Sequence, residues 1–437
     1  MNILIAGAGQ VGFNLARTLS IGNNVTVIDQ NEKALHRIQE SLDILPLHGN
    51  VENSTTYEGF KHTKIDLFIA VTNIDNVNLI ATMIANSILD IDKTFVRLQK
   101  YFKDIFIIKE KLGVDEIIFP TRLASKSVAS LLNYPKANNV KFFKYTKNKL
   151  ISLRVSQNFH AKKIESDNFI KVGIERNKDF FIPDEDEIIM PNDLVYFFGA
   201  EEKIQKVCSL IDNTPIKNIQ KCVVYGGDEL GIAIAKVLLE AKKDVKVIEK
   251  NMELCEIAER ELQGEATVIN AKYSARDIFE EENLSNADIF IATTKNDEFN
   301  IIKCLEAKER GIQKIVAINN DMEYYNLMHS LGIIASRGPK VSAYNKIMEE
   351  LSSQGVVIQK SFCGSKAVIL LRKIYITSKY LKRKIKPIAI SNIKIYYIRE
   401  EKLYPLQEKI LMHENDIIIA FATTKTMPKV KKWIYEL

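Results

Sequence analysis

The sequence predicts an α/β protein in which two doubly wound parallel sheets occur in tandem, each followed by a small α+β lobe. Three observations support this fold class. A short apolar run followed by a glycine-rich turn opens the chain, the same unit restarts about halfway along it, and a shorter strand-rich segment follows each copy. Strands that alternate with helical patterns are typical of a parallel sheet with helices on both faces.

The first turn has the spacing of a phosphate-binding turn. Residues 3–6 form an apolar run typical of a buried strand, and residues 7–12, GAGQVG, fit GxGxxG. The first glycine of such a turn allows the tight bend, the second admits a pyrophosphate, and the third lets the helix and strand pack closely. The helical pattern that follows directs its N-terminal N–H groups at the same point, which favours an anion.

An acid stands at the end of the second predicted strand. Asp29 follows the apolar run 25–28 and lies 22 residues after Gly7. A carboxylate at this place accepts hydrogen bonds from a ribose 2′-hydroxyl and repels a 2′-phosphate. The order of strand, turn, helix, strand and acid therefore predicts a Rossmann-like dinucleotide or adenine-nucleotide site, with NAD(H) preferred over NADP(H).

The unit occurs twice. Residues 223–231, VVYGGDELG, place Gly226 219 residues after Gly7, and the following strand ends in Glu249 where the first ends in Asp29. Residues 65–78, IDLFIAVTNIDNVN, are matched by ADIFIATTKNDEFN at 287–300. Two alignments at a nearly constant offset indicate an internal duplication.

The second copy departs from the motif at two places. Asp228 stands where the middle glycine would be, and the strand 314–318 ends without the arginine that Arg97 supplies in the first copy. Asp228 adds a Cβ and a negative charge where a pyrophosphate would approach, and like charges a few ångströms apart repel. We therefore expect the second lobe to bind nucleotide weakly or not at all.

The smaller lobes repeat as well. Residues from about 140 to 212 predict an alternating strand (150–155), a short polar helix, another strand (169–175), an Asn-Asp turn with a strand (192–199) and a terminal helix. Asn415-Asp416 and the apolar run after them repeat that turn. Helical patterns at 121–132 and 341–351 are interpreted either as crossover or hinge helices or as simple core packing. The predicted domains are residues 1–120, 121–212, 219–337 and 338–437.

The composition of the chain and the spacing of its cysteines and histidines argue against several classes of protein. The chain has 437 residues, 46% of them hydrophobic and 27% charged, which is ordinary for a soluble globular protein. It shows neither an apolar run of bilayer length nor a signal-peptide pattern, so a cytosolic protein is expected. The five cysteines never have CxxC spacing and are expected to be reduced core thiols. The six histidines form no recognisable catalytic or metal frame, so no catalytic residue and no metal ligand is predicted; His48 alone lies beside the predicted nucleotide site.

The C-terminal part of the chain is basic. Residues 356–437 hold 17 Lys and Arg against 6 Asp and Glu, although the whole chain has a net charge of only +6. The densest cluster, YLKRKIK at 380–386, would face anionic headgroups, an acidic partner or nucleic acid, or would simply be solvated. No DNA- or RNA-reading module surrounds it, so no nucleic-acid partner is expected.

The tandem order and several motifs resemble the TrkA family, the cytosolic regulatory subunits of Trk potassium uptake systems. The motifs are GAGQVG, VTVID, LHGN and AVTNIDNVN in the first half, and CEIAEREL and GIQKIVAINN in the second. The resemblance covers nearly the whole chain and implies two regulator-of-potassium-conductance (RCK) units, each with a Rossmann-like N-lobe and a small C-lobe. It further implies a homo-oligomeric, tetrameric ring under a membrane-embedded potassium transporter subunit, peripheral to the inner face of the cell membrane. The implied cofactor is NAD(H), with ATP or ADP as alternatives.

Carried onto this sequence, the resemblance assigns the candidate nucleotide-binding residues. In the first lobe they are Gly7, Gly9, Gln10, Val11 and Gly12 at the pyrophosphate, Asp29 at the ribose, Asn50 and Val51 near the adenine, Thr72 and Asn73 on the third loop, and Arg97 as the cation. In the second lobe they are Gly226, Gly227, Glu229, Leu230, Gly231 and Glu249. An arginine fork suits phosphate, whereas a salt-bridged rim arginine is the other interpretation of Arg97.

The expected function is regulation: nucleotide bound in the first lobe shifts the angle between lobes, and the ring passes this motion to the transporter. The alternatives are an NAD-dependent oxidoreductase and a nucleotide-responsive regulator of transcription. An oxidoreductase requires an acid or base beside the nicotinamide, and a transcription regulator requires a helix-turn-helix; neither has support from particular residues. NAD⁺, NADH, ATP and ADP share the pyrophosphate, ribose and adenine that the candidate residues address, so all four stay open.

Overall fold

The computed structural model describes residues 1–437 except 102–103, 135, 144, 165–168, 212–217, 272–274, 353–356 and 407–409. The chain divides into two compact units. The first consists of Met1–Ala124 and Arg337–Met348, and the second of Ser125–Ser336 and Glu349–Leu437.

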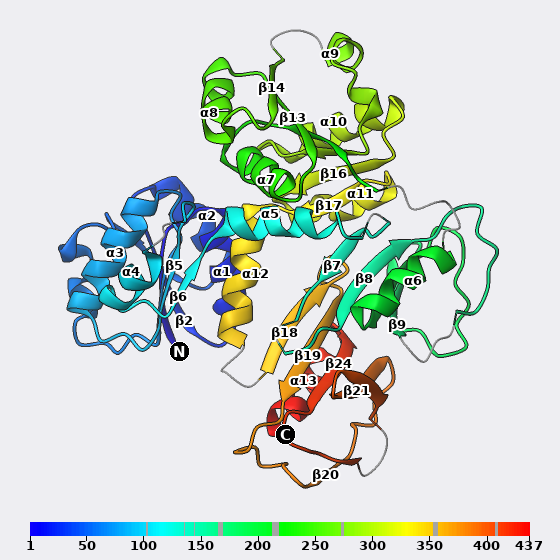
Figure 1. Ribbon diagram of the computed structural model, residues 1–437. Helices are drawn as coiled ribbons and strands as arrows, with labels where there is room; N and C mark the ends of the chain where they lie inside the picture. Colours follow the sequence, from blue (N-terminus) through cyan, green and yellow to red (C-terminus); the bar gives the residue numbers. More distant parts are fainter. Residues whose placement is uncertain are drawn as a thin grey trace. The chain divides into compact units, whose positions relative to one another are not determined.

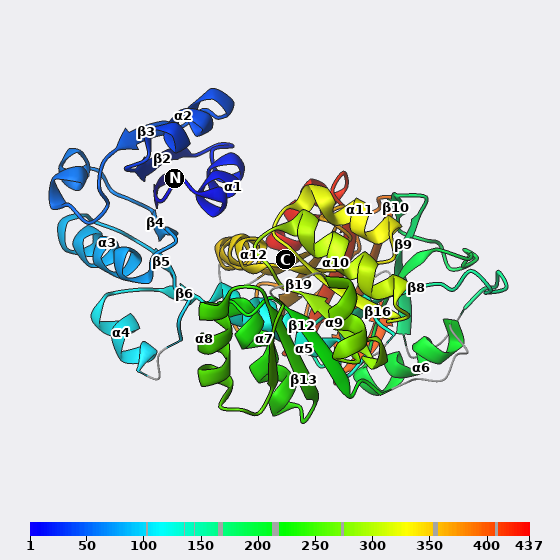
Figure 2. The same cartoon turned by 90° about the horizontal axis from the view of Figure 1, so that it is seen from above.

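The first unit is built on a six-stranded parallel sheet with the strand order β3-β2-β1-β4-β5-β6. In this order the chain starts at the middle of the sheet and winds outward in both directions. Figures 1 and 2 show α3 and α4 on one side of the sheet and α1 on the other. The elements are β1 (Asn2–Ala6), α1 (Gln10–Leu19), β2 (Asn24–Asp29), α2 (Glu32–Ser41), β3 (Leu45–His48), a 3₁₀ helix (Ser54–Phe60), β4 (Leu67–Ala70), α3 (Asp75–Ile88), β5 (Thr94–Arg97), α4 (Ile105–Lys111) and β6 (Glu116–Ile118).

The central strands of this sheet are buried on both faces. All four residues of β4 are buried, as are the last four of β1, because helices cover both sides. This explains why these strands read as continuous apolar runs in the sequence rather than as alternating ones.

Helix α12 (Pro339–Ser352) comes from the second repeat but packs on the first lobe. The Tyr344 and Thr18 hydroxyl oxygens lie 2.9 Å apart, and Lys346 Nζ lies 3.7 Å from a carboxylate oxygen of Glu116. Helix α5 (Pro120–Ser130) corresponds to the other predicted helix between lobes.

The second unit contains a parallel sheet with the equivalent order, β14-β13-β12-β15-β16-β17. The predicted duplication and the predicted Rossmann-like fold are therefore confirmed. Its elements are β12 (Lys221–Tyr225), α7 (Glu229–Glu240), β13 (Asp244–Glu249), α8 (Met252–Leu262), β14 (Thr267–Asn270), α9 (Ala275–Glu281), β15 (Ile289–Ala292), α10 (Asp297–Glu309), β16 (Lys314–Asn319), α11 (Tyr325–Ser330) and β17 (Ile334–Arg337), with 3₁₀ turns at Leu284–Asn286 and Met322–Tyr324.

The same unit holds two small antiparallel sheets with equivalent strand orders, β10-β9-β11-β8-β7 and β18-β19-β24-β21-β22. The first comprises β7 (Asn139–Lys141), β8 (Lys149–Arg154), β9 (Phe169–Arg176), β10 (Asp179–Phe181) and β11 (Leu194–Gly199), followed by α6 (Glu201–Ile211). The second comprises β18 (Val357–Phe362), β19 (Ala367–Lys373), β21 (Ile393–Arg399), β22 (Lys402–Pro405) and β24 (Ile417–Thr423), followed by α13 (Met427–Glu436); β20 (Lys384–Ile385) and β23 (Ile410–Leu411) form a separate pair.

The two small sheets share one hydrophobic core. Buried residues of both sheets belong to the same cluster, and the rings of Phe198 and Phe421 lie 5.3 Å apart edge to face. The apolar faces of the two small lobes therefore cover each other within one chain.

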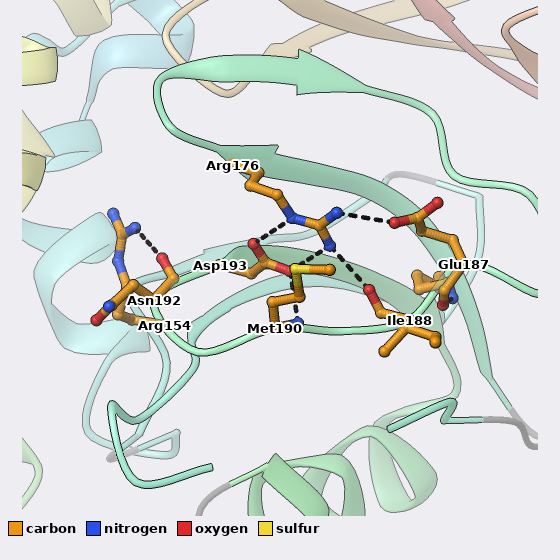
Figure 3. Close-up of polar contacts among 8 residues, drawn as sticks. Arg154, Arg176, Glu187, Ile188, Met190, Asn192 and Asp193 are labelled. Carbon is orange, nitrogen blue, oxygen red and sulfur yellow. Dashed lines mark hydrogen bonds and ion pairs between the residues drawn. The ribbon is translucent and has the colours of Figure 1, made fainter. Parts of the chain in front are cut away.

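The Asn-Asp turn that repeats in the small lobes has a structural role, shown in Figure 3. Asn192 adopts a left-handed backbone with φ of 67°, and the buried carboxylate of Asp193 accepts two hydrogen bonds of 2.9 Å from Arg176. Arg399 and Asp416 form the same bidentate pair in the second small lobe, at 2.9 and 2.6 Å. The turn thus anchors the sheet and is not part of a ligand site.

One local expectation was wrong over the residues that the structure describes. The short polar helix predicted between the strands that are now β8 and β9 is not formed by residues 156–164, which make a turn and an isolated bridge from Lys162 to Ile189; residues 165–168 lie outside the description. The segment is polar because it is exposed, and polarity alone does not specify a helix. The five cysteines are buried free thiols, as predicted.

Candidate nucleotide-binding site

The candidate residues of the first lobe meet at the carboxyl edge of the parallel sheet. Gly7 follows β1, Asp29 ends β2, Thr72 follows β4 and Arg97 ends β5. These strands are neighbours, and ligands of open α/β sheets bind at this edge. The loops also touch, because a Cβ placed on Gly7 would lie 3.0 Å from the Thr72 nitrogen.

The three glycines of the turn have different roles. Gly7 has φ of +117°, a conformation that side chains rarely adopt, and a Cβ on Gly12 would lie 1.9 Å from the Gly7 carbonyl oxygen. Both positions are therefore required by the fold itself. A Cβ on Gly9 would meet nothing within 4 Å. The middle glycine leaves open space over the turn, which fits the close approach of a pyrophosphate.

The N-terminus of α1 faces this space with unused donors. Gly9 is the N-cap residue and supplies no side-chain acceptor. Over the described part of the chain, no side chain accepts a hydrogen bond from the N–H groups of Val11 or Gly12. Unpaired N–H groups and the positive end of the helix dipole together suit an anion.

Asp29 is held in a fixed orientation beside the turn. Its Oδ2 accepts a 2.6 Å hydrogen bond from the Ala8 N–H, and its Oδ1 accepts a 2.8 Å bond from the Asn31 N–H. Each carboxylate oxygen can accept a second bond. The carboxylate therefore has acceptor capacity left for ribose hydroxyls.

Arg97 is 6% exposed at the end of β5. Its Nη1 donates to the Asn73 Oδ1 at 3.3 Å, so the guanidinium borders the loop after β4. The Asn73 carbonyl in turn accepts a 2.6 Å bond from the Gln99 side chain. The structure thus brings the candidate cation next to two of the candidate loop residues, Thr72 and Asn73.

The buried side chain of Asn78 fixes this loop, a role that its repetition in the sequence did not disclose. Its Oδ1 accepts hydrogen bonds from the Thr72 N–H at 2.8 Å and the Thr72 hydroxyl at 2.7 Å, and its Nδ2 donates to the Arg97 carbonyl at 2.8 Å. Asn300 makes the equivalent bonds to Thr294 and Ile318. The sequence contained one sign of this role, because a Thr is followed six residues later by an Asn in both halves of the chain.

Asn50 and Val51 lie on the loop after β3. Asn50 Oδ1 accepts a 2.9 Å bond from the Glu52 N–H, and its carbonyl accepts a 2.7 Å bond from Thr56. The Val51 side chain is buried in the core, and its carbonyl accepts a 2.7 Å bond from the Tyr57 hydroxyl. Only the backbone of Val51 is therefore available to a ligand. His48, on the same strand end, has an exposed ring whose Nε2 lies 3.2 Å from the Gln30 carbonyl oxygen.

The glycine turn of the second lobe has the same backbone conformation as the first. A carboxylate of the chain itself lies at the N-terminus of its helix. Gly226 has φ of +119°, and a Cβ on Gly231 would lie 1.8 Å from the Gly226 carbonyl oxygen. Asp228 is the N-cap of α7, and its Oδ1 accepts hydrogen bonds from the Leu230 N–H at 3.1 Å and the Gly231 N–H at 3.2 Å. A carboxylate of the chain itself thus takes the donors that are unused in α1.

The charges around Asp228 are also balanced internally. Burial raises the pKa of the Asp228 carboxyl, while the hydrogen bond from Gly231 and the positive charge of Lys295 oppose that rise. Ile318 stands in β16 where Arg97 stands in β5, since the two carbonyls accept the equivalent bonds from Asn300 and Asn78. Glu249 Oε2 accepts a 2.7 Å bond from the Gly227 N–H, which matches the bond from Ala8 to Asp29. Glu229, Leu230 and Gly231 form the first turn of α7.

Comparison with known proteins identifies the family. The sequence model of the TrkA-N domain matches residues 3–120 and 222–336, which together make up more than half of the chain. The chain belongs to the TrkA-N domain family. The two TrkA-N segments coincide with the two parallel sheets, so the resemblance inferred from the motifs is confirmed.

Two relatives that match this chain over almost their whole length are both named Trk system potassium uptake proteins. A Trk system potassium uptake protein TrkA homolog 2 of Methanosarcina mazei is 27% identical over 99% of this chain and 99% of its own. The Trk system potassium uptake protein TrkA of Vibrio alginolyticus is 25% identical over 97% of this chain and 96% of its own. The similarity to these relatives therefore extends beyond the two TrkA-N segments to nearly the whole chain.

Solved RCK structures share the fold. The GsuK RCK domain superposes with a TM-score of 0.63 at 14% identity, over 100% of this chain and 95% of that one. The GsuK channel bound to NAD gives a TM-score of 0.63 at 14% identity, over 100% of this chain and 79% of that one. Across the described residues, no helix combines the length and apolarity needed to cross a bilayer, and no group of three or more His, Cys, Asp or Glu is placed to hold a metal.

Proposed function

We propose that this TrkA-N protein is the nucleotide-binding regulatory subunit of a potassium uptake system and gates a membrane potassium transporter. The full-length relatives support the role, since they are named as Trk potassium uptake proteins. The observation that carries the nucleotide-dependent part is the first turn. It combines open space over Gly9, N–H groups of α1 not bonded to described side chains, and a carboxylate and an arginine on either side.

The proposed ligand is NAD(H), with ATP and ADP as the other candidates. The N–H groups of Val11 and Gly12 would hold the pyrophosphate, Asp29 the adenosine ribose, and Arg97 a phosphate oxygen. Asp29 would repel the 2′-phosphate of NADP(H). The GsuK channel, a structural neighbour, was solved bound to NAD, which supports this class of ligand.

The proposed partner is a membrane-embedded potassium transporter subunit, and the proposed assembly is a tetrameric ring of this chain at the cytoplasmic face of the membrane. Exposed apolar side chains on α3 and α4 support self-association: Met83 is 49% exposed, Phe106 74% and Ile107 53%. Clustered large apolar side chains on a surface favour protein contacts. No nucleic-acid partner is proposed.

We also propose the domain plan 1–120, 121–212, 219–337 and 338–437. The parallel sheets fall in the first and third segments and the antiparallel sheets in the second and fourth. Residue 212, the end of the second segment, lies outside the described residues.

Catalysis is not part of the proposal. The histidine nearest the first turn, His48, is on an exposed strand end and contacts a backbone carbonyl. An oxidoreductase would need a positioned acid or base beside the nicotinamide. An NAD-dependent oxidoreductase remains the alternative, and it is distinguished by turnover.

Two measurements test the proposal. Calorimetric titration of the full chain with NAD⁺, NADH, ATP and ADP should give one strong site per chain, and NADPH should bind more weakly than NADH. Potassium flux should then be measured in liposomes that contain the membrane subunit of a Trk system, with and without this chain and with each nucleotide. Flux that ignores both additions, or steady turnover of a nicotinamide with a small substrate, would contradict the proposal.

A further inference from the structure

The last small lobe carries a concentrated group of exposed cations. Exposed basic side chains lie on the segment 379–386 and on α13, and we call them the basic face: Lys379, Lys382, Arg383, Lys384, Lys386, Lys429 and Lys432. Ion pairs of this lobe use Lys360, Lys366 and Arg399 instead, and none of the seven forms an ion pair with a described residue. Outside residues 356–437 the chain has 44 basic and 49 acidic residues, because 17 of 61 basic and 6 of 55 acidic residues lie within that segment.

The backbone under the basic face is ordered. The Lys382 N–H donates to the Met412 carbonyl at 3.0 Å, and the Met412 N–H donates to the Arg383 carbonyl at 3.2 Å. Lys384 then pairs with Leu411 in the β20–β23 ladder, which Figure 1 locates in the last lobe by the label β20. The cations are therefore presented by a fixed ladder rather than by a loose tail.

Helix α13 contributes to the same surface. The indole N–H of Trp433 donates to the Lys386 carbonyl at 3.3 Å, which places this side of the helix beside the ladder. Lys429, Lys432 and Trp433 lie on one side of α13 because they are three and four residues apart. Val430 and Ile434 are buried in the core of the lobe, against which Trp433 packs with part of its surface.

Exposed apolar side chains border the basic face. Ile376 is 71% exposed and stands three residues before Lys379, and Leu411, the ladder partner of Lys384, is 43% exposed. Cations beside apolar side chains match a membrane interface, where lysine and arginine attract anionic headgroups and apolar side chains enter the acyl boundary. A surface that reads duplex nucleic acid would instead present an element that enters a groove.

We propose that the basic face of the last lobe binds directly to an anionic lipid surface. This contact would hold the protein against the membrane independently of the transporter. The inference deepens the proposed membrane-peripheral location and rests on it, but its test uses neither nucleotide nor transporter. A negative result would therefore leave the nucleotide site and the gating role standing.

The experiment is flotation of the full chain with vesicles of phosphatidylcholine alone or with about 30% phosphatidylglycerol, at about 100 and about 500 mM KCl. The wild-type chain should float only with the anionic vesicles and only at low salt. The variant K382E/R383E/K384E should bind them at least about tenfold more weakly, because three attractive charges become repulsive. The control K93E/K147E/K221E makes the same change in net charge at exposed sites elsewhere and should bind as the wild type does.

Several results would overturn the proposal: no binding to anionic vesicles, equal binding to neutral vesicles, or equal losses in the test and control variants. A duplex DNA arm separates lipid from nucleic acid. If the wild-type chain binds DNA as well as it binds anionic vesicles and K382E/R383E/K384E loses both, the surface is a general polyanion site and the lipid assignment fails. Equal thermal melting of both variants establishes that folding is unaffected.

Discussion

The two parallel-sheet lobes have the same strand order and nearly superimposable glycine turns, yet they treat an anion in opposite ways. In the first, Gly9 leaves space before α1, and no described side chain accepts from Val11 or Gly12. In the second, Asp228 occupies that space and accepts hydrogen bonds from Leu230 and Gly231. At this one position the first lobe has a helix without a side-chain cap and the second has a self-capped helix.

The difference extends to the neighbouring loop. The first lobe has Asn73 and Arg97 where the second has Lys295 and Ile318. In the first, the Arg97 guanidinium borders the loop after β4; in the second, the charge of Lys295 opposes the burial that raises the pKa of Asp228. We infer that duplication allowed the second lobe to keep the fold while giving up the ligand.

The largest effect is expected from transferring the second lobe's aspartate to the first. Gly9→Asp should weaken nucleotide binding at least about 100-fold, or about 2.7 kcal/mol, because the new carboxylate takes the α1 donors and repels the pyrophosphate. A Cβ at this position meets nothing within 4 Å, so the fold should tolerate the change. Calorimetry measures the loss. Gly9→Ala is the control and should lose less than about tenfold, because it adds no charge; equal losses in both variants would show that volume matters and charge does not.

The next effect is expected at the cation. Arg97→Asn removes the positive charge, which the equivalent Ile318 of the second lobe also lacks, and should weaken nucleotide binding by about 30-fold, since a hydrogen bond to a charged group contributes about 1.5–3 kcal/mol. Arg97→Lys keeps the charge but not the planar fork and should recover only part of the affinity. Fluorescence titration with NADH gives both values. If Arg97→Asn bound nucleotide as tightly as the wild-type chain and melted at the same temperature, Arg97 would not contact the nucleotide.

Removing the built-in anion should open the second lobe. In Asp228→Gly the donors of Leu230 and Gly231 are released, and we expect a second site per chain that is strengthened about tenfold over the wild type but stays weaker than the first, because no arginine ends β16. Glycine is itself a tolerated N-cap, so the stability cost should be only a few tenths of a kcal/mol. Calorimetric stoichiometry is the readout. Two equal sites in the wild-type chain would contradict the self-capping interpretation, and Asp228→Asn tests whether the charge is the cause.

The smallest expected effect is on the pH dependence of stability, and it comes from His329, a buried histidine of the second parallel-sheet lobe. Burial and the nearby charge of Arg154 lower the pKa of His329 to about 3, and its Nδ1 lies 3.2 Å from an Arg154 nitrogen. The unfolded chain binds a proton near pH 6.5 that the native chain does not bind, so stability falls as the pH drops below that value. Between pH 7.5 and 6 the loss should be about 0.8 kcal/mol. Melting temperatures across this range measure it.

A matched pair of variants isolates the histidine. His329→Asn keeps an acceptor for Arg154 and should remove this part of the pH dependence. His36→Asn, at an exposed histidine of the first lobe, is the control for the effect of the substitution itself. Identical pH profiles for the wild-type chain and His329→Asn would mean that His329 does not titrate in this manner.

The sequence was informative wherever backbone requirements dictate residue type. The positive φ of Gly7 and the contact between Gly12 and the Gly7 carbonyl permit only glycine, so the turn and its repeat could be recognised directly. The same holds for the doubled Asn-Asp turn, although its bond to Arg176 spans 17 residues and could not be inferred from spacing. Long-range partners of this kind depend on tertiary packing.

Two parts of the candidate site required the structure. Asn78 was recognised as a repeated residue, but its bonds join the ends of two strands, and sequence does not specify which carbonyl a buried amide will reach. Asp228 was expected to repel a ligand, whereas the structure adds that its carboxylate already holds the helix N–H groups. Asparagine and aspartate are common N-caps, so that signal was present in the sequence.

The single core that joins the two antiparallel sheets has a consequence for how such a chain can be cut or shortened. Each half expressed alone would present the apolar surface that now includes Phe198 or Phe421 to water. Fragments of that kind aggregate or seek a complementary surface, so co-expressed halves should reassemble into a heterodimer. The covalent link between repeats replaces a concentration-dependent encounter with a permanent one, which makes the pairing of the small sheets insensitive to dilution.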